Sequence, residues 1–150
     1  MPKNAFGNGQ AGALDGALAS LLDLSLLTKH AHWNVVGPRF ASLHELLDEL
    51  SGIASIGADR VAERAVTLGH APDGRASTIA SLSALPTIEP GAQPDAGTLL
   101  AFTAILDGLM TCIHAALQAF ESDLVTVDLF THVLADVERC AWMLRAQRDQ

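Results

Sequence analysis

Apolar residues recur at alternating steps of three and four along most of the chain, which is the spacing of one face of an α-helix. The first stripe predicts a helix from about Gly12 to Val36, and the second predicts a helix over roughly 40–68. Two further helices are predicted over Ala96–Phe120 and Val125–Gln147. No β-sheet is required anywhere, so the pattern predicts an all-α fold.

Turn-forming residues separate these helices. Gly37 and Pro38 interrupt the first stripe and predict a tight reversal, because proline cannot continue a helix. From Ala71 to Pro94 the chain carries four of its six prolines, and this segment is too long for a simple turn. We expect a long crossover with room for a short extra helix around Ser77–Ser83. Two helical hairpins joined by one long crossover are typical of a ferritin-like four-helix bundle, whereas up-down bundles have short loops.

Composition adds constraints on size, assembly and location. A chain of 150 residues with 49% hydrophobic residues is expected to form a single domain over residues 1–150, with residues 1–11 as a flexible tail. Only 17% of residues are charged, which favours burial against other subunits. The net charge of −8, with Lys3 and Lys29 isolated, favours the binding of cations over the binding of nucleic acid. No apolar run of seven or more residues precedes Asp15, so we expect a cytoplasmic protein without signal peptide or membrane anchor.

Histidines and carboxylates gather near the predicted reversal and along the second helix. His32 and His44 lie at nearly equal distances in sequence from the reversal, so a hairpin there brings both imidazoles to the same height. His44 and Asp48 are four residues apart, as are Asp59 and Glu63, so each pair shares a helical face. All four positions of the second helix fall within an arc of roughly 100°.

This arrangement requires two copies of the helix. His44 and Asp59 are about 22 Å apart along the helix axis, so one copy cannot wrap both pairs around one metal ion. If two copies pack antiparallel about a two-fold axis, the register that matches His44 with Glu63 also matches Asp48 with Asp59. The spacing therefore predicts two equivalent metal sites at an isologous dimer interface. Histidine nitrogens with carboxylate oxygens suit iron, manganese or zinc without selecting among them.

Spacing alone leaves a second interpretation open. Asp59 and Glu63 can form a solvated face with Arg60 and Arg64, while the histidines serve as core residues with satisfied hydrogen bonds. A purely structural helical oligomer would then result, without metal-dependent activity.

Two segments of the sequence match a known family signature. The segment KHAHWNVVGPRFASLHELLDEL at 29–50, followed by GADRVAERAVTLG at 57–69, resembles the signature of Dps proteins, the DNA-protection-during-starvation mini-ferritins. The resemblance continues weakly through SLSALPTIEP at 81–90 and returns in DLFTHVLADVERCAWMLRAQ at 128–147, so it covers nearly the whole chain. An ordinary ferritin is disfavoured because no Glu-x-x-His pair occurs in the chain.

The resemblance implies a dodecamer, a hollow shell built from two-fold dimers. Ferrous iron is oxidised there, by hydrogen peroxide in preference to oxygen, and deposited as a ferric mineral, which protects against oxidative damage. By position in the motif, His32 and His44 are the histidines of the ferroxidase centre and Asp48 is the carboxylate one turn on. Asp59 and Glu63 are the ligands from the neighbouring subunit. Iron is then the expected metal, with zinc or manganese as substitutes.

Two neighbours of these ligands have alternative roles. Trp33 matches the family's tryptophan near the site, where it acts either as an electron donor or as packing. Lys29, one turn before His32, either pairs with Asp48 or is exposed to solvent.

The ends of the chain depart from the DNA-binding members of the family. Those members often use a lysine-rich tail, whereas MPKNAFGNGQA holds one lysine and LRAQRDQ holds two arginines and one aspartate. Few phosphates can be neutralised by so few cations, so we expect direct DNA binding to be weak or absent. The alternative is a DNA-compacting shell, associated with the nucleoid, whose metal chemistry is secondary.

Overall fold

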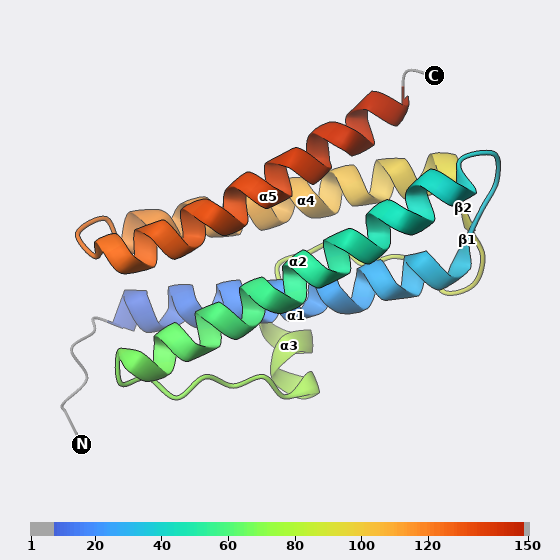
Figure 1. The fold of residues 1–150 in the computed structure, drawn as a ribbon. Helices are drawn as coiled ribbons and strands as arrows, with labels where there is room; N and C mark the ends of the chain where they lie inside the picture. Colours follow the sequence, from blue (N-terminus) through green and yellow to red (C-terminus); the bar gives the residue numbers. More distant parts are fainter. Residues whose placement is uncertain (1–7, 149–150) are drawn as a thin grey trace.

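The structure is a computed structural model, which describes residues 8–148. Its elements in chain order are α1 (Asn8–Asn34), β1 (Val35–Val36), α2 (Phe40–Thr67), α3 (Ala76–Leu82), β2 (Gln93–Pro94), α4 (Asp95–Ala119) and α5 (Leu124–Arg148). Helices α1 and α2 form one antiparallel hairpin, α4 and α5 form another, and the two hairpins pack together (Figure 1). The predicted all-α, ferritin-like four-helix bundle is therefore confirmed.

The first helix starts earlier than expected. It begins at Asn8 rather than near Gly12, so residues 8–11 form its first turn and do not belong to a tail. The side-chain amide of Gln10 donates a hydrogen bond to the carbonyl oxygen of Ala119 at 3.0 Å, which ties this turn to the end of α4. The rest of the expected tail, residues 1–7, lies outside the described residues.

The same helix ends at Asn34 rather than at Val36. Val35 and Val36 are extended, as suits β-branched residues, and pair in parallel with Gln93 and Pro94. The expectation that the fold needs no β-structure was wrong for this two-residue bridge. Its effect is to fasten the α1–α2 turn to the end of the crossover.

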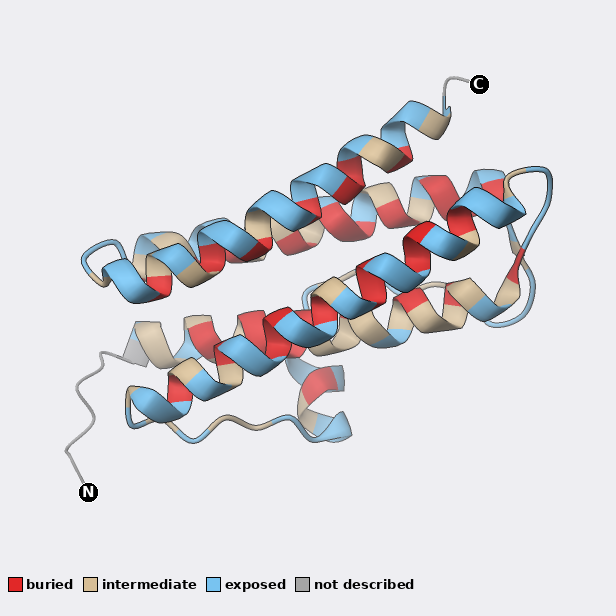
Figure 2. Cartoon of the chain, viewed as in Figure 1, coloured by how far each residue is buried: buried red, intermediate tan, exposed pale blue. Residues whose placement is uncertain are grey.

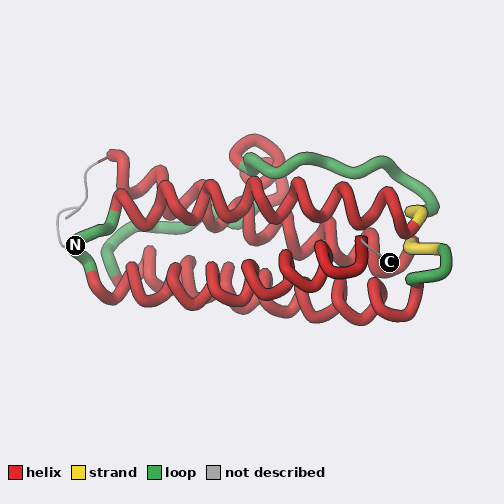
Figure 3. Tube along the Cα trace, turned by 90° about the horizontal axis from the view of Figure 1, so that it is seen from above, coloured by secondary structure: helices red, strands yellow, loops and turns green. Residues whose placement is uncertain are grey.

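The long crossover between α2 and α4 contains the short helix that the sequence predicted near Ser77–Ser83. Figure 3 shows the crossover running along the outside of the bundle toward the start of α4. Leu85 and Ile88 of the crossover pack against the core. The crossover therefore connects two ends of the bundle and also covers part of its side.

Helices α1 and α4 supply much of the core. By length and composition the segments Gly9–Asn34 and Asp95–Ala119 are apolar enough to cross a membrane. In this structure they are core helices of the bundle, and the buried faces of the helices turn inward (Figure 2). Leu21, Phe102 and Leu106 are among their fully buried side chains. Burial inside the fold thus accounts for part of their hydrophobicity.

The turn between α1 and α2 is anchored to the start of α4. Gly37 has a φ of 121°, a value that favours glycine, and a Cβ atom there would lie 2.8 Å from Cγ of Asp95. The buried Asp95 carboxylate accepts hydrogen bonds from the backbone N–H of Arg39 at 3.0 Å and from its guanidinium at 3.1 Å. The backbone hydrogen bond lowers the pKa of Asp95. These contacts fix where α2 begins relative to the end of α1.

A second polar cluster joins α2 to the start of α5. Asp123 caps α5 by accepting hydrogen bonds from the backbone N–H of Val125 at 3.2 Å and from the Thr126 hydroxyl at 2.7 Å. The Arg64 guanidinium donates to the same carboxylate at 2.8 Å. Burial raises the pKa of Asp123, but the hydrogen bonds from Thr126 and Arg64 outweigh it and lower the pKa to about 2.

We predict that Asp123→Asn lowers the free energy of unfolding by about 1–2 kcal/mol at pH 7, because a charge-assisted hydrogen bond to Arg64 is lost. The pKa of about 2 lies below the ordinary value of 3.8. The stabilisation is therefore fully present above pH ~4 and is lost as the pH falls toward ~2. Urea unfolding at fixed protein concentration measures the difference between variant and wild type. Glu121→Gln, at an exposed neighbouring carboxylate, is the control. An equal Asp123→Asn difference at pH 7 and at pH ~2.5 would contradict the prediction.

Candidate metal centre

Two histidine rings meet at the closed end of the α1–α2 hairpin. His32, in the last turn of α1, stacks on His44 of α2 with ring centroids 3.7 Å apart and an angle of 17° between the planes. The prediction that the hairpin brings these imidazoles level is confirmed. Phe40 stacks on the His44 ring at 5.0 Å, so three rings form one layered group.

Reciprocal hydrogen bonds orient the two imidazoles. Nδ1 of His32 lies 2.8 Å from the backbone oxygen of His44, and Nδ1 of His44 lies 2.9 Å from the backbone oxygen of His32. A carbonyl oxygen can only accept, so Nδ1 carries the proton in both rings. In a neutral ring Nε2 then keeps its lone pair, and this is the way protein histidines are commonly prepared to bind a metal ion.

Asp48 follows one turn after His44 on the exposed side of α2. Its carboxylate forms an ion pair with Nζ of Lys29, which is one of the two roles that the sequence left open for this lysine. The hydrogen bond from Lys29 lowers the pKa of Asp48, so the carboxylate is ionised near neutral pH. A cation bound by Asp48 would share the carboxylate with the Lys29 ammonium group.

Asp59 and Glu63 lie toward the other end of α2, and both are exposed. Within residues 8–148 neither carboxylate makes a hydrogen bond or an ion pair with another side chain. Arg64 instead bonds Asp123 and Thr126. In the described part of the chain Asp59, Arg60 and Glu63 are exposed, as the solvated-face interpretation expects, but Arg64 does not belong to that face.

A single chain does not assemble a complete metal site from its described residues. Among them no three His, Cys, Asp or Glu side chains are placed to hold one ion. The structure brings His32 and His44 together and places Asp48 one turn away, but leaves Asp59 and Glu63 at a distance along α2. Trp33, next to His32, is 72% exposed and so is not packed into the core of its own chain.

The family model for the ferritin-like domain matches residues 11–150. The DNA protection during starvation protein of Agrobacterium fabrum is 32% identical over 148 residues, which cover 97% of this chain and 91% of that protein. The chain belongs to the Dps family of ferritin-like proteins. DNA protection during starvation protein 2 of Deinococcus radiodurans is 40% identical over 136 residues. Those residues cover 89% of this Dps chain but only 56% of that longer relative.

Solved Dps structures agree with the fold. Dps92 from Deinococcus radiodurans superposes with a TM-score of 0.87 at 37% identity, covering 92% of this chain and 84% of that chain. Dps from Microbacterium arborescens in its high iron form gives a TM-score of 0.87 at 30% identity, covering 98% and 99% of the two chains. The bundle seen in this Dps chain is therefore the fold of the family over nearly its whole length.

We predict that His32→Ala lowers the free energy of unfolding of the metal-free Dps protein by about 1–2 kcal/mol. The change removes one of the two reciprocal hydrogen bonds, that from Nδ1 of His32 to the backbone oxygen of His44. Urea unfolding at one protein concentration measures the effect. His114→Ala, at an exposed position on α4, is the control and should change stability by less than about 0.5 kcal/mol. Equal effects of the two substitutions would mean that the reciprocal bonds contribute nothing.

Proposed function

We propose that this Dps protein oxidises ferrous iron and stores the ferric product, at metal sites shared between two subunits. One observation carries the proposal. Each chain presents two imidazoles oriented by their Nδ1 hydrogen bonds and, farther along the same face of α2, two carboxylates without partners among the described residues. Membership of the Dps family supports iron storage and DNA protection as the general role.

The two half-sites are complementary under a two-fold axis. Antiparallel packing of α2 against α2 places His44 opposite the partner's Glu63, and Asp48 opposite the partner's Asp59. The pairing is centred between Ile53 and Ala54, where Gly52 and Ser55 are small enough to let the helices approach closely. Because the interface is isologous, each dimer would hold two equivalent centres.

At such a centre iron is the substrate, and the electrons given up by iron equal those taken up by the oxidant. Two ferrous ions each give up one electron, and hydrogen peroxide takes up both electrons and two protons to become two molecules of water. Nε2 of His32 and His44 bind the metal, and the carboxylates of Asp48, Asp59 and Glu63 offset its charge. Few strong ligands leave coordination positions open for the oxidant. Oxygen would serve as a slower oxidant.

Other features of the chain fit this role. Zinc and manganese accept the same donor set, so they would occupy the centre as substitutes and compete with iron. Trp33 follows His32 in the chain and is exposed, and it would act as an electron donor or as packing. The low charged fraction of 17% favours further burial of surface in a shell of twelve subunits. We place this shell in the cytoplasm.

The test follows the growth of ferric absorbance when metal-free protein meets ferrous iron and limiting peroxide. The double variant Asp59→Ala, Glu63→Ala should oxidise iron about tenfold more slowly or worse, because it removes the ligands that the partner supplies. The matched control is Asp136→Ala, Glu138→Ala, which removes two exposed carboxylates from α5. Equal rates in wild type and the Asp59, Glu63 double variant would reject the shared centre.

DNA compaction is the second candidate, favoured by the name of the relatives, DNA protection during starvation protein. It predicts a gel shift of DNA that weakens steeply as salt rises. The net charge of −8 opposes such binding, so we expect protection of DNA to come from removal of iron and peroxide. A shift that persists at physiological salt would favour the second candidate.

A further inference from the structure

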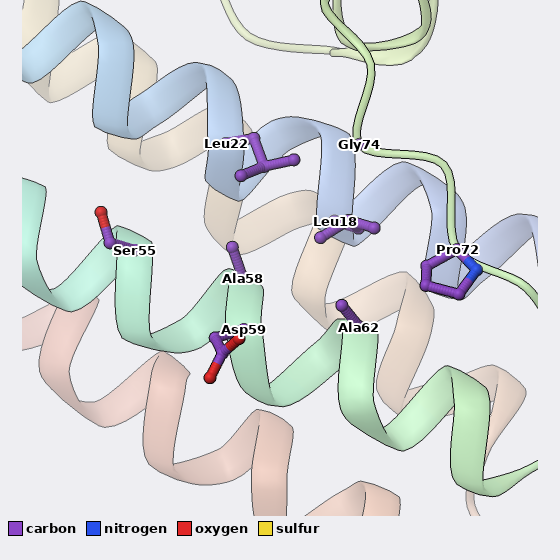
Figure 4. A pocket seen from close by; sticks show the side chains of 8 residues that line it. All are labelled: Leu18, Leu22, Ser55, Ala58, Asp59, Ala62, Pro72 and Gly74. Carbon is purple, nitrogen blue, oxygen red and sulfur yellow. The ribbon is translucent and has the colours of Figure 1, made fainter.

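An apolar groove of about 320 Å³ opens between α1 and α2 next to Asp59. Figure 4 shows the side chains around it, with those of α1 on one side, those of α2 on the other, and the start of the crossover at one end. The lining residues are Leu18, Leu22, Ser55, Ala58, Asp59, Ala62, Pro72 and Gly74. The groove therefore adjoins a residue of the proposed metal centre but is itself apolar.

A stripe of side chains on α1 runs along the same surface. Leu22, Leu26, Lys29 and Trp33 follow one another at steps of four, three and four, which places them on one face of the helix. Leu22 lines the groove and Lys29 pairs with Asp48, so this face is the one that carries the proposed centre. Leu26 is 60% exposed and Trp33 is 72% exposed. The chain thus leaves two large apolar side chains of this face uncovered.

The register of the hairpin shows which residue of α2 lies at the same height as Leu26. His32 is level with His44, Lys29 is level with Asp48, and the Ser51 hydroxyl donates to the backbone oxygen of Ser25 at 3.5 Å. In this register Leu26 is level with Leu50.

The two-fold pairing then gives the part of the second subunit that lies opposite Leu26. Because it is centred between residues 53 and 54, it sets residue 50 of one copy opposite residue 57 of the other. The part of α2 that lines the groove runs from Ser55 to Ala62, so residue 57 lies within it. Trp33, by the same count, is level with residue 43 and faces residue 64, beyond the groove.

We propose that the groove of each subunit receives Leu26 of the partner subunit. This inference rests on the two-fold arrangement of the proposed function and adds the apolar contact that holds it. The contact occurs twice in each dimer. It removes exposed apolar surface from water, which favours association. It also excludes water beside Asp59, where the interaction of the carboxylate with a cation becomes stronger as the surroundings become less polar.

Cysteine cross-linking in the metal-free protein tests the contact directly. The double variant Leu26→Cys, Ser55→Cys is treated with a short bismaleimide, and covalent dimers are measured by denaturing gel. The matched control is Leu100→Cys, Ser55→Cys, since Leu100 is 57% exposed but lies on α4. Each single variant is a further control, and it also accounts for Cys112 and Cys140, which are half-buried and buried.

We expect a severalfold higher yield of covalent dimer from Leu26→Cys, Ser55→Cys than from any control. A yield no higher than the controls, in protein that light scattering shows to be assembled, overturns the proposal. A wild-type protein that never associates overturns it as well. Because the cross-link forms without iron, it reports on the interface whether or not the protein oxidises iron.

A second variant keeps the test independent of cysteine chemistry. Leu26→Glu should raise the dissociation constant of the dimer by at least about tenfold, because a charge replaces an apolar group that the proposed dimer buries. Sedimentation measures the constant, and far-UV circular dichroism checks that the exposed substitution leaves the helices intact. An unchanged dissociation constant overturns the contact. Loss of iron oxidation in Asp59→Ala, Glu63→Ala with a normal Leu26 cross-link would support both proposals separately.

Discussion

The register between α1 and α2 is the constraint on which the rest of the site depends. A shift of α2 by one residue would turn its side chains by about 100° and move them by about 1.5 Å, which would separate the His32 and His44 rings. The reciprocal bonds from Nδ1 to the backbone oxygens tie the register to the rings themselves. The hydrogen bonds from Arg39 to Asp95 fix the turn from the other side. The centre and the helical hairpin are therefore held by the same contacts.

Much of this arrangement could be predicted from the sequence because it is periodic or local. The apolar stripes gave the four long helices, and equal distances from Pro38 placed His32 level with His44. The β1–β2 bridge could not be predicted, since it pairs two residues with two others near the far end of a long crossover. The hydrogen bond between Nε2 of His70 and the carboxylate of Asp15 at 2.7 Å was missed for the same reason. Contacts between distant segments follow from the packing of the whole bundle and leave no local pattern.

The charges along α2 are divided in a way that suits a site completed by a cation. Arg64 does not pair with Glu63, because its guanidinium bonds Asp123 and Thr126 at the start of α5. Lys29 offsets Asp48, whereas Asp59 and Glu63 have no such partner among the described residues. In the proposed dimer Asp59 would lie opposite the second copy's Asp48, and bringing two carboxylates close together costs electrostatic energy unless a positive charge enters. A bound metal ion supplies that charge and would be among the largest local charges in the site.

A ligand set spread along one straight helix makes the proposed chemistry conditional on assembly. Residues 44 and 59 of one α2 helix remain about 22 Å apart however the side chains rotate, so an isolated subunit offers the iron only its histidine pair and Asp48. In the proposed dimer the second copy would bring the missing carboxylates and, through Leu26, the apolar contact beside them. An oxidising centre would then exist only where a subunit is already part of a dimer. Under this proposal ferrous iron would be oxidised at the wall of the proposed shell, and not on free subunits.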